Sequence, residues 1–368
     1  MTGRRPTSRP KPTNDLESQL RVIERGSGDG DLIFGRGVSL HVSSLGKPYF
    51  ANGITKGALM RYYSRIWPVL GPHVKDRPLV LKRYPDGVGG PMFYQQNAGD
   101  HVPVAVRVET FDTRDEGPKP RIVGGNLATL LYTVQIGSIE VHPWLSRVRS
   151  IDTPDRCLID LDPGDDVSFS AVVALARDVL GILRQCALTA AVKTSGSSGM
   201  HLVIPLPPRT SWDTSAHLAM LVARAVVAQR PERATVERTI HSRPPGTIYV
   251  DAMQNARGKS MACAYSVRAR DGATVSAPVR EGELTARLRT EAFTVGTMPA
   301  RVDRAGDVYG DALEAAPTKR VLATAMRALE QVLDDAPAVE KPQRGKKRSS
   351  RGGTDVQSTV RRRRRTGA

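Results

Sequence analysis

The chain has 368 residues, of which 40% are hydrophobic and 25% charged, and this ordinary globular composition excludes wholesale disorder. No run approaches the roughly 18 apolar residues of a membrane span, and no apolar stretch follows the basic N-terminus as it would in a secretory signal. The cysteines Cys157, Cys186 and Cys263 form no CxxC pair, which excludes a disulfide framework and a cysteine-rich zinc site and fits a reducing cytoplasm.

The net charge of +17 is concentrated at the two ends of the chain. Residues 341–368 hold eleven Lys or Arg and one Asp, residues 1–13 hold four Lys or Arg, and the remainder carries only +3. Basic tails attract polyanions through counterion release, whatever the sequence. We therefore expect the run Arg361–Arg365 to contact nucleic acid, with a role in solubility or localisation as the alternative.

The first half of the chain predicts a disordered start, one helix and several short strands. Residues 1–30 are rich in Pro, Gly, Ser and charge, which is typical of disorder. Apolar residues at spacings of three and four predict a helix from Thr55, an N-cap residue, to Trp67, and Pro68 should end or kink it. Apolar runs between Gly and Pro predict strands at 38–42, 79–82, 104–108 and 132–136.

The second half mixes apolar runs with amphipathic helical patterns. Helices are predicted over 169–186, 215–229 and 318–334, a Gly/Ser loop over 194–199, and strands over 157–161 (followed by a turn at 162–164), 188–192, 201–205, 247–250 and 265–270. Strands and helices do not strictly alternate, so the fold class is α+β or mixed α/β. One folded domain is expected over 31–335, and residues 336–368 are expected to be disordered.

Acidic residues end two of the predicted strands. Asp160 and Asp162 are two residues apart, so both side chains point to one face. Like charges that close are costly without a cation, and Mg²⁺ and Mn²⁺ prefer carboxylate ligands. Asp251 ends another apolar run, and three such acids suit a two-metal site for in-line phosphoryl displacement. Solvated strand-end acids are the simpler alternative, and DxD also occurs in metal-dependent glycosyltransferases.

Other motifs suit an anionic ligand. The loop Thr194–Gly199 can present backbone N–H groups to phosphate, although it lacks the Walker pattern; a flexible hairpin loop is the alternative. Lys82 and Arg83 end one predicted strand, and Arg268 and Arg270 share a face of another. Such pairs can hold a triphosphate, or they can be solvated surface charge.

Together these motifs resemble the primase-polymerase domain of bacterial DNA ligase D, within the archaeo-eukaryotic primase superfamily. The six ordered segments that carry the resemblance, which covers residues 35–310, are 81–87, 140–144, 159–163, 194–201, 250–255 and 265–270. The resemblance implies an α+β fold with a primase-type (prim-pol) mixed β-sheet core, flanking helices and basic tails. It also implies a template-directed nucleotidyltransferase that extends primer 3′ ends at gaps or double-strand breaks, often with ribonucleotides.

The resemblance assigns roles residue by residue. Asp160 and Asp162 would bind two Mn²⁺ or Mg²⁺ ions, and Asp251 would hold the ion that activates the primer 3′-hydroxyl. Lys47 and Lys56 would grip the 5′-phosphate of the downstream DNA strand. Phe93 and Tyr94 would stack on template bases. The residues that would line the nucleotide and its triphosphate are Lys82, His142, Ser195, His201, Arg243, Gln254, Arg268 and Arg270.

The chain also departs from the family pattern. Ser198 stands where the glycine loop usually carries Lys, Ala264 stands where Pro is usual, and the Lys47–Lys56 spacing and the stretch 243–246 each differ by one residue. No ligase lysine motif or HxD-type nuclease segment accompanies the domain, so we expect a stand-alone bacterial cytoplasmic polymerase at the nucleoid, with DNA, nucleotides, Ku and a separate ligase as partners. The alternatives are another DxD transferase and a catalytically weak DNA-end binding module.

Overall fold

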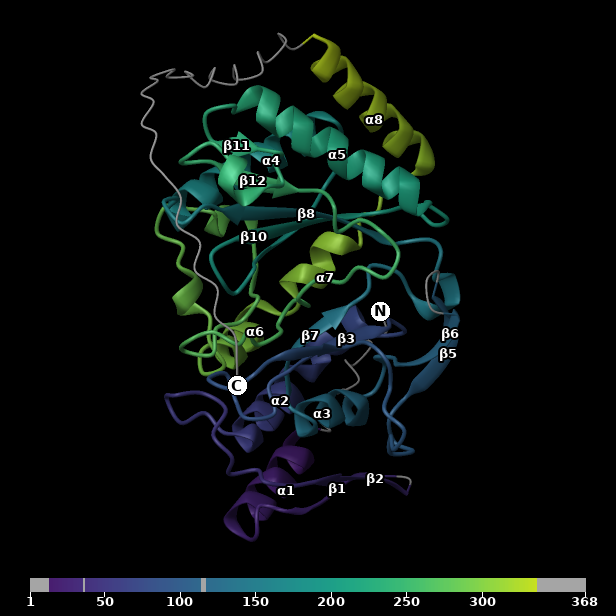
Figure 1. Ribbon diagram of the computed structural model, residues 1–368, viewed down its shortest axis with the longest axis vertical. Helices are drawn as coiled ribbons and strands as arrows, with labels where there is room; N and C mark the ends of the chain where they lie inside the picture. The colour runs from purple at the N-terminus through teal and green to yellow at the C-terminus, as the bar shows by residue number, and fades with distance from the viewer. Residues whose placement is uncertain (1–12, 36, 114–116, 336–368) are drawn as a thin grey trace, which may run out of the picture. The chain divides into compact units, whose positions relative to one another are not determined.

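The computed structural model describes residues 13–335, apart from residue 36 and residues 114–116 (Figure 1). Residues 1–12 and the basic segment from 336 onward lie outside the described residues, so the predictions made for them stay predictions. Mixed helices and strands confirm the predicted α+β class. No helix within the described part is long and apolar enough to cross a membrane.

The elements follow one another in mixed order. The helices are α1 (Thr13–Arg25), α2 (Lys56–Val74), α3 (Leu127–Gln135), α4 (Phe169–Gln185), α5 (Trp212–Gln229), α6 (Met298–Ala305), α7 (Val308–Leu313) and α8 (Lys319–Asp334). The strands are β1 (Gly30–Gly35), β2 (Val38–Val42), β3 (Leu79–Arg83), β4 (Phe93–Gln95), β5 (Val108–Thr113), β6 (Gly117–Ile122), β7 (Ser138–Pro143), β8 (Arg156–Pro163), β9 (Ala191–Thr194), β10 (Met200–Pro205), β11 (Ala234–Thr235), β12 (Ile248–Asp251) and β13 (Pro278–Val279).

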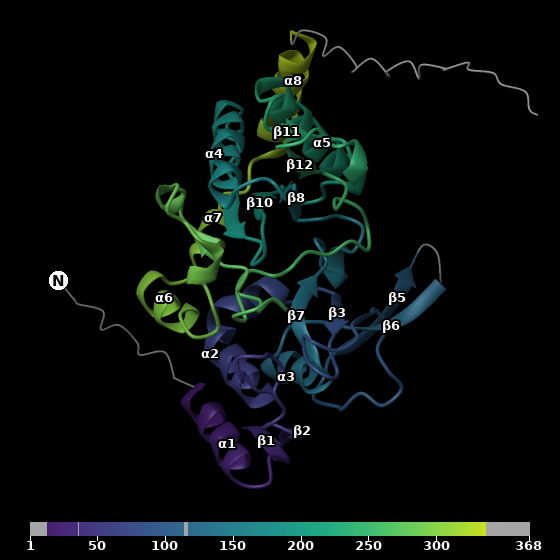
Figure 2. The ribbon, with the colours of Figure 1, turned by 60° about the vertical axis from the view of Figure 1, so that its left-hand side comes forward.

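The largest sheet has the strand order β11-β12-β8-β10-β9-β13. Neighbouring strands run antiparallel except for the parallel pair β11 and β12. Helices α4 and α5 pack on β8, α7 packs on β9 and β10, and Figure 1 shows α5 and α7 on opposite sides of these strands. Helix α8 lies along α5 (Figure 2). Burial on both faces explains why Cys157, Leu158 and Ile159 are consecutive apolar residues.

A second antiparallel sheet has the order β4-β3-β7, and β7 packs on α2 and α3. The segment 260–279 connects it to the large sheet. Cys263 N donates to Val141 O in β7 at 2.8 Å, and Thr194 N in β9 donates to Ala277 O at 2.9 Å. Because one segment is hydrogen-bonded to both sheets, side chains from both can converge on a single site.

Helix α2 starts where the sequence predicts and ends later. The Thr55 hydroxyl caps it by accepting a backbone N–H. The helix then continues through Pro68 and Pro72, so the predicted end is wrong. Each proline removes a helix hydrogen bond, but Val69 and Leu70 are buried in the core. Packing of this last part of the helix offsets the lost hydrogen bonds.

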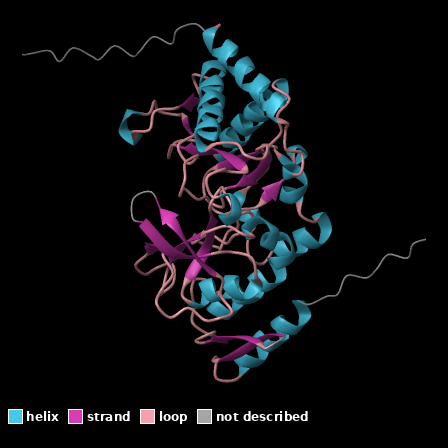
Figure 3. Cartoon of the chain, turned by 90° about the vertical axis from the view of Figure 1, so that its right-hand side faces the viewer, coloured by secondary structure: helices cyan, strands magenta, loops and turns pink. Residues whose placement is uncertain are grey.

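The predicted disorder over residues 1–30 is wrong from residue 13, where α1 begins. Leu16 and Leu20 lie four residues apart on one helix face and are buried. Helix α1 packs on α2 and on β1 of the β1–β2 hairpin, which Figure 3 shows beside a helix at one end of the chain. The polar composition of the segment concealed this short apolar stripe.

Three predicted strands are wrong or misplaced. Residues 132–135 belong to helix α3 and Ile136 is its C-cap, although the run is rich in β-branched and aromatic residues. Asn126 caps the start of this helix by accepting the N–H of Thr129 at 2.7 Å. The strand predicted at 104–108 begins only at its last residue. The described residues 265–270 form no regular strand: Tyr265 lies in a turn with φ +68°, Val267 makes an isolated bridge to Val275, and the chain bends at 269–270. In contrast, β8 runs through the predicted turn as far as its Asp-Pro end.

Candidate active site

Three carboxylates come together where β8 lies beside β12. Asp160 pairs directly with Asp251 of β12 on one side and with His201 of β10 on the other. Asp162 lies two residues further along β8, so it shares the face of Asp160. The strand register therefore brings together the three acids that the sequence predicts to act together.

The charges of this group favour a bound cation. Burial, together with the charges of Asp162 and Asp251, raises the pKa of Asp160 to about 7. Asp162 Oδ2 lies 3.3 Å from Arg243 Nη1, and Asp251 Oδ2 accepts a hydrogen bond from Gln254 Nε2 at 3.2 Å. Among the described residues, no group of three or more His, Cys, Asp or Glu is arranged to hold a metal ion as it stands. The oxygen donors and their mutual repulsion nevertheless fit Mg²⁺ or Mn²⁺.

His201 faces Asp160 from the neighbouring strand, with Nε2 3.4 Å from Oδ1. Its other ring nitrogen, Nδ1, is hydrogen-bonded to Lys193 Nζ, which also donates to Ser276 Oγ at 2.8 Å. Lys193 is fully buried, and burial together with the charge of Arg268 lowers its pKa to about 7. Sequence reasoning missed Lys193. Its signal was a lysine in an apolar run, where a charged side chain needs partners.

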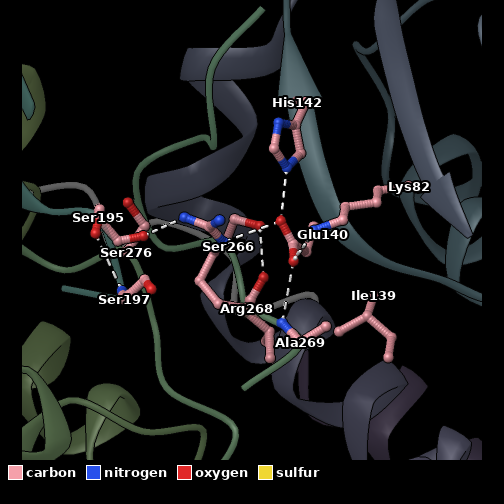
Figure 4. A network of polar contacts seen from close by, with 12 residues as sticks. Lys82, Ile139, Glu140, His142, Ser195, Ser197, Ser266, Arg268, Ala269 and Ser276 are labelled. Carbon is pink, nitrogen blue, oxygen red and sulfur yellow. Dashed lines mark hydrogen bonds and ion pairs between the residues drawn. The ribbon is translucent and has the colours of Figure 1, made fainter. Parts of the chain in front are cut away.

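A second cluster surrounds the buried Glu140 of β7. Its carboxylate lies 3.3 Å from Lys82 Nζ, 2.8 Å from His142 Nε2 and 2.9 Å from Arg268 Nε (Figure 4). Burial alone would raise the pKa of Glu140, but the hydrogen bond from His142 and the charge of Arg268 hold it far below its usual range. Three predicted nucleotide-binding residues thus meet on one carboxylate that the sequence analysis left without a role. The sequence feature that could have indicated a role for Glu140 is its position two residues before His142, which places both side chains on one strand face.

The Gly/Ser loop between β9 and β10 forms as predicted. Ser195 Oγ accepts the backbone N–H groups of Ser197 and Gly199, both at 3.1 Å, and Arg268 Nη1 donates to Ser195 O. A Cβ added at Gly199 would lie 2.3 Å from Leu161 O, so only glycine allows the loop to pass this close to β8. The loop therefore lies directly beside the strand that carries the carboxylates.

A cleft of about 270 Å³ opens between the two sheets. Arg243 lies beside the acids rather than in the lining, with its guanidinium 4.2 Å from the centre of the Tyr249 ring. The residues that line the cleft are Tyr94, His142, Leu158, Asp160, His201, Gln254, Ser260, Met261, Ala262 and Arg268.

Other predicted site residues lie at the margin. Arg270 is exposed in the turn that replaces the predicted strand, and it is not among the residues that line the cleft. Phe93 and Tyr94 are exposed on the edge strand β4, and Tyr94 reaches the cleft lining. Arg83 lies over the Phe93 ring at 5.1 Å.

Lys47 and Lys56 lie together at the start of α2. The backbone N–H of Lys56 donates to Lys47 O at 2.9 Å. Lys56 is buried and its Nζ donates to Ser43 O at 3.0 Å, whereas Lys47 Nζ pairs with Asp86 at 3.0 Å and is 38% exposed. Burial and the neighbouring charge of Lys47 lower the pKa of Lys56. The two cations and the N-terminus of the helix form a positive site outside the cleft.

The fold is that of a DNA ligase polymerase domain. The structure is similar to the polymerase domain from Mycobacterium tuberculosis ligase D in complex with DNA, with a TM-score of 0.69 and 28% sequence identity, over 76% of this chain and 99% of that one. The sequence model of the LigD primase-polymerase domain matches residues 55–309, and the chain belongs to this family. The predicted resemblance is therefore confirmed.

Longer proteins contain the same domain. The multifunctional non-homologous end joining protein LigD of Pseudomonas aeruginosa is 34% identical over 254 residues, which are 69% of this chain and 30% of that protein. The bifunctional non-homologous end joining protein LigD of Bacillus subtilis is 31% identical over 274 residues, 74% of this chain and 44% of that protein. The chain thus spans less than half the length of these relatives.

Proposed function

We propose that the chain is a template-directed nucleotidyltransferase of DNA end repair, which adds nucleotides, preferentially ribonucleotides, to primer 3′ ends at gaps or double-strand breaks. The observation that carries this proposal is the opposition of Asp160 and Asp251 on adjacent strands, with Asp162 on the same face. Membership of the LigD primase-polymerase family supports it.

Asp160, Asp162 and Asp251 would hold two divalent ions, Mn²⁺ or Mg²⁺. Bound there, the ions would lower the pKa of an attacking hydroxyl and neutralise charge on the transferred phosphoryl group. The protein contributes orientation. Because β8 is paired on both edges, its two acids cannot shift without breaking the sheet. Arg243 donates to Oδ2 of Asp162, and Gln254 donates to Oδ2 of Asp251, so each of these carboxylates is oriented by a protein donor.

The surrounding side chains would bind the nucleotide and the DNA. His201 and Arg268 line the cleft beside the acids, and the N–H-rich loop at 194–199 passes next to them. The exposed rings of β4 offer a flat surface for template bases. The positive site at Lys47 and Lys56 lies on a different element and suits a separate phosphate of the DNA.

Primer extension on a gapped, 5′-phosphorylated duplex with Mn²⁺ tests this function. Wild-type protein should extend the primer, and Asp160→Asn should abolish extension while DNA binding is retained. Asp178→Asn is a matched control, because Asp178 is an α4 carboxylate paired with Arg230 at 2.9 Å and is not part of the cleft lining. Extension by Asp160→Asn at the wild-type rate would refute the catalytic role of the carboxylates.

A DNA-end binding module with weak catalysis is the second candidate. The loop carries Ser198 where the family pattern has a lysine, so one cation fewer is available for a triphosphate. Wild-type protein that binds gapped DNA but adds neither ribonucleotides nor deoxyribonucleotides would favour this candidate. For either function we propose action in the bacterial cytoplasm at the nucleoid, with Ku and a separate ligase as partners, in line with the end-joining names of the relatives.

A further inference from the structure

The carboxylate of Glu140 is a meeting point for four hydrogen-bond donors. Glu140 is 2% exposed. Its Oε1 receives Lys82 Nζ at 3.3 Å and the backbone N–H of Ala269 at 3.2 Å, and its Oε2 receives Arg268 Nε at 2.9 Å and His142 Nε2 at 2.8 Å. Figure 4 shows these groups approaching the carboxylate from different sides. Both oxygens are therefore fully used inside the protein.

An ionised carboxylate can only accept hydrogen bonds, so His142 must carry a hydrogen on Nε2. Burial lowers the pKa of His142, although Glu140 acts in the opposite direction, and this favours the neutral ring. A neutral ring protonated on Nε2 has a lone pair on Nδ1. His142 lines the cleft, and Nδ1 accepts no hydrogen bond within the described residues. The ring therefore presents an acceptor to whatever occupies the cleft.

We propose that Glu140 is a positioning residue of the nucleotide site, which fixes His142 as the Nε2-protonated tautomer and holds Lys82 and Arg268 beside it. The inference deepens the proposed function and rests on it for the identity of the ligand. Phosphate oxygens are acceptors, so they pair with the two cations. His142 Nδ1 instead accepts a hydrogen from a sugar hydroxyl or a base N–H of the nucleotide.

Substituting Glu140 by Gln makes this arrangement testable. The amide group must place an NH₂ where one carboxylate oxygen lies. On the Oε1 side it would meet Lys82 and the Ala269 N–H, which are both donors. On the Oε2 side it meets only one fixed donor, Arg268 Nε, together with His142, the one partner that can become an acceptor by moving its hydrogen to Nδ1. Glu140→Gln should therefore invert the tautomer, whereas Glu140→Asp keeps the charge and should retain the wild-type tautomer.

Nitrogen-15 NMR of the imidazole rings measures the tautomer directly in nucleotide-free protein, with the His142 signals assigned by their loss in His142→Gln. The expected result is Nε2–H in the wild type and in Glu140→Asp, and Nδ1–H in Glu140→Gln. Glu283→Gln is the control, because Glu283 pairs with Arg301 at 2.6 Å and does not contact His142; it should leave the His142 signals unchanged. A wild-type ring with Nδ1–H alone, a doubly protonated ring at pH 7.5, or an unchanged tautomer in Glu140→Gln overturns the proposal.

Kinetics supply the second measurement. Glu140→Gln should raise the nucleotide KM about tenfold or more, the size of one lost charge-assisted contact, while Glu140→Asp restores most of the affinity. Running the comparison with ATP, 2′-deoxy-ATP and 3′-deoxy-ATP locates the nucleotide group that donates to His142 Nδ1. A smaller rise in KM with one analogue assigns the donor to the hydroxyl which that analogue lacks, and equal rises assign it to the base. An unchanged or lower KM overturns the positioning role. The NMR measurement needs no turnover. If the wild-type protein is inactive but the His142 tautomer is inverted in Glu140→Gln, only the proposed function is refuted.

Discussion

Replacing Lys56 by Met tests the positive site at the start of α2. Lys56 is 6% exposed and lies at the first turn of the helix, where the helix dipole favours an anion. Burial and the charge of Lys47 lower the pKa of Lys56, and a bound phosphate would relieve the repulsion between the two lysines. We expect the variant to lose affinity for gapped DNA that carries a 5′-phosphate and to bind 5′-hydroxyl DNA normally.

The burial of each lysine sets the magnitude. A charge-assisted contact to phosphate in a buried position contributes about 2–3 kcal/mol, so Lys56→Met should weaken binding roughly 30- to 150-fold by the rule of 1.4 kcal/mol per decade. Lys47 is 38% exposed and already paired with Asp86, so solvent screening reduces its contribution to below about 1 kcal/mol. Lys47→Met should therefore cost at most about fivefold.

Fluorescence anisotropy on two duplexes that differ only in the 5′ group makes the comparison. Lys319→Met is the matched control, because Lys319 also follows a threonine N-cap at the first position of a helix, α8, but is exposed. It should leave both affinities unchanged, and thermal unfolding should show that Lys56→Met remains folded. An equal loss on phosphorylated and hydroxylated DNA, or a larger loss for Lys47→Met than for Lys56→Met, would refute the reasoning.

Three further predictions follow from other features. Deleting 341–368 removes a net charge of +10 and should flatten the slope of log K against log[salt] for DNA binding, so an unchanged slope would show that this segment does not contact DNA. Gly199→Ala should lower the free energy of unfolding by about 1–3 kcal/mol, because the added Cβ meets Leu161 O. Gly181→Ala, where the added Cβ lies in open space on α4, should be neutral or stabilising by up to about 1 kcal/mol. Equal urea midpoints for the two variants would contradict this prediction. Burial alone would raise the pKa of Glu140, but the hydrogen bond from His142 and the charge of Arg268 hold this pKa far below its usual value of 4.5. Burial would likewise raise the pKa of Asp155, but the charges of Arg77 and Arg156 hold it at about 2. The unfolded chain then binds more protons below pH 5, so stability measured by urea unfolding should fall as the pH drops from about 5 to 2 and be flat if the pairs are absent.

The sequence predicted the central part of the domain well because local pattern and tertiary burial agree there. The four apolar residues of 157–161 are buried, and the helix at 169–185 has the apolar stripe that its sequence indicates. The disagreements occur where tertiary contacts override composition. Residues 132–136 have strand-forming side chains, but the preceding asparagine cap and the packing of α3 against α2 and β7 make them helical.

The sequence predicted that the three acids lie together, but it predicted the arrangement of the basic residues around them only in part. Period-two spacing was enough to place Asp160 and Asp162 on one face, and the end of an apolar run marked Asp251. Arg270 was misplaced because the chain bends at 269–270 and turns back there, with Ala273 N donating to Arg270 O at 2.9 Å, so Arg270 does not continue the extended segment that contains Arg268. The only local signal of Glu140 was its position two residues before His142, since its role arises from partners on β3, β7 and a segment more than a hundred residues away.

Strand β8 is hydrogen-bonded along both edges, to β10 and β12, and packs against α4 and α5. A strand held in this way opens only when the whole domain unfolds, so its amides should exchange with solvent as slowly as any in the chain. A destabilising substitution at a distant position, such as one that creates a cavity beneath α8, would then reduce the fraction of folded molecules. The molecules that remain folded would keep their kinetic constants. Loss of activity in variants of this kind would be a matter of protein abundance, which a titration of active sites would separate from a change in catalysis.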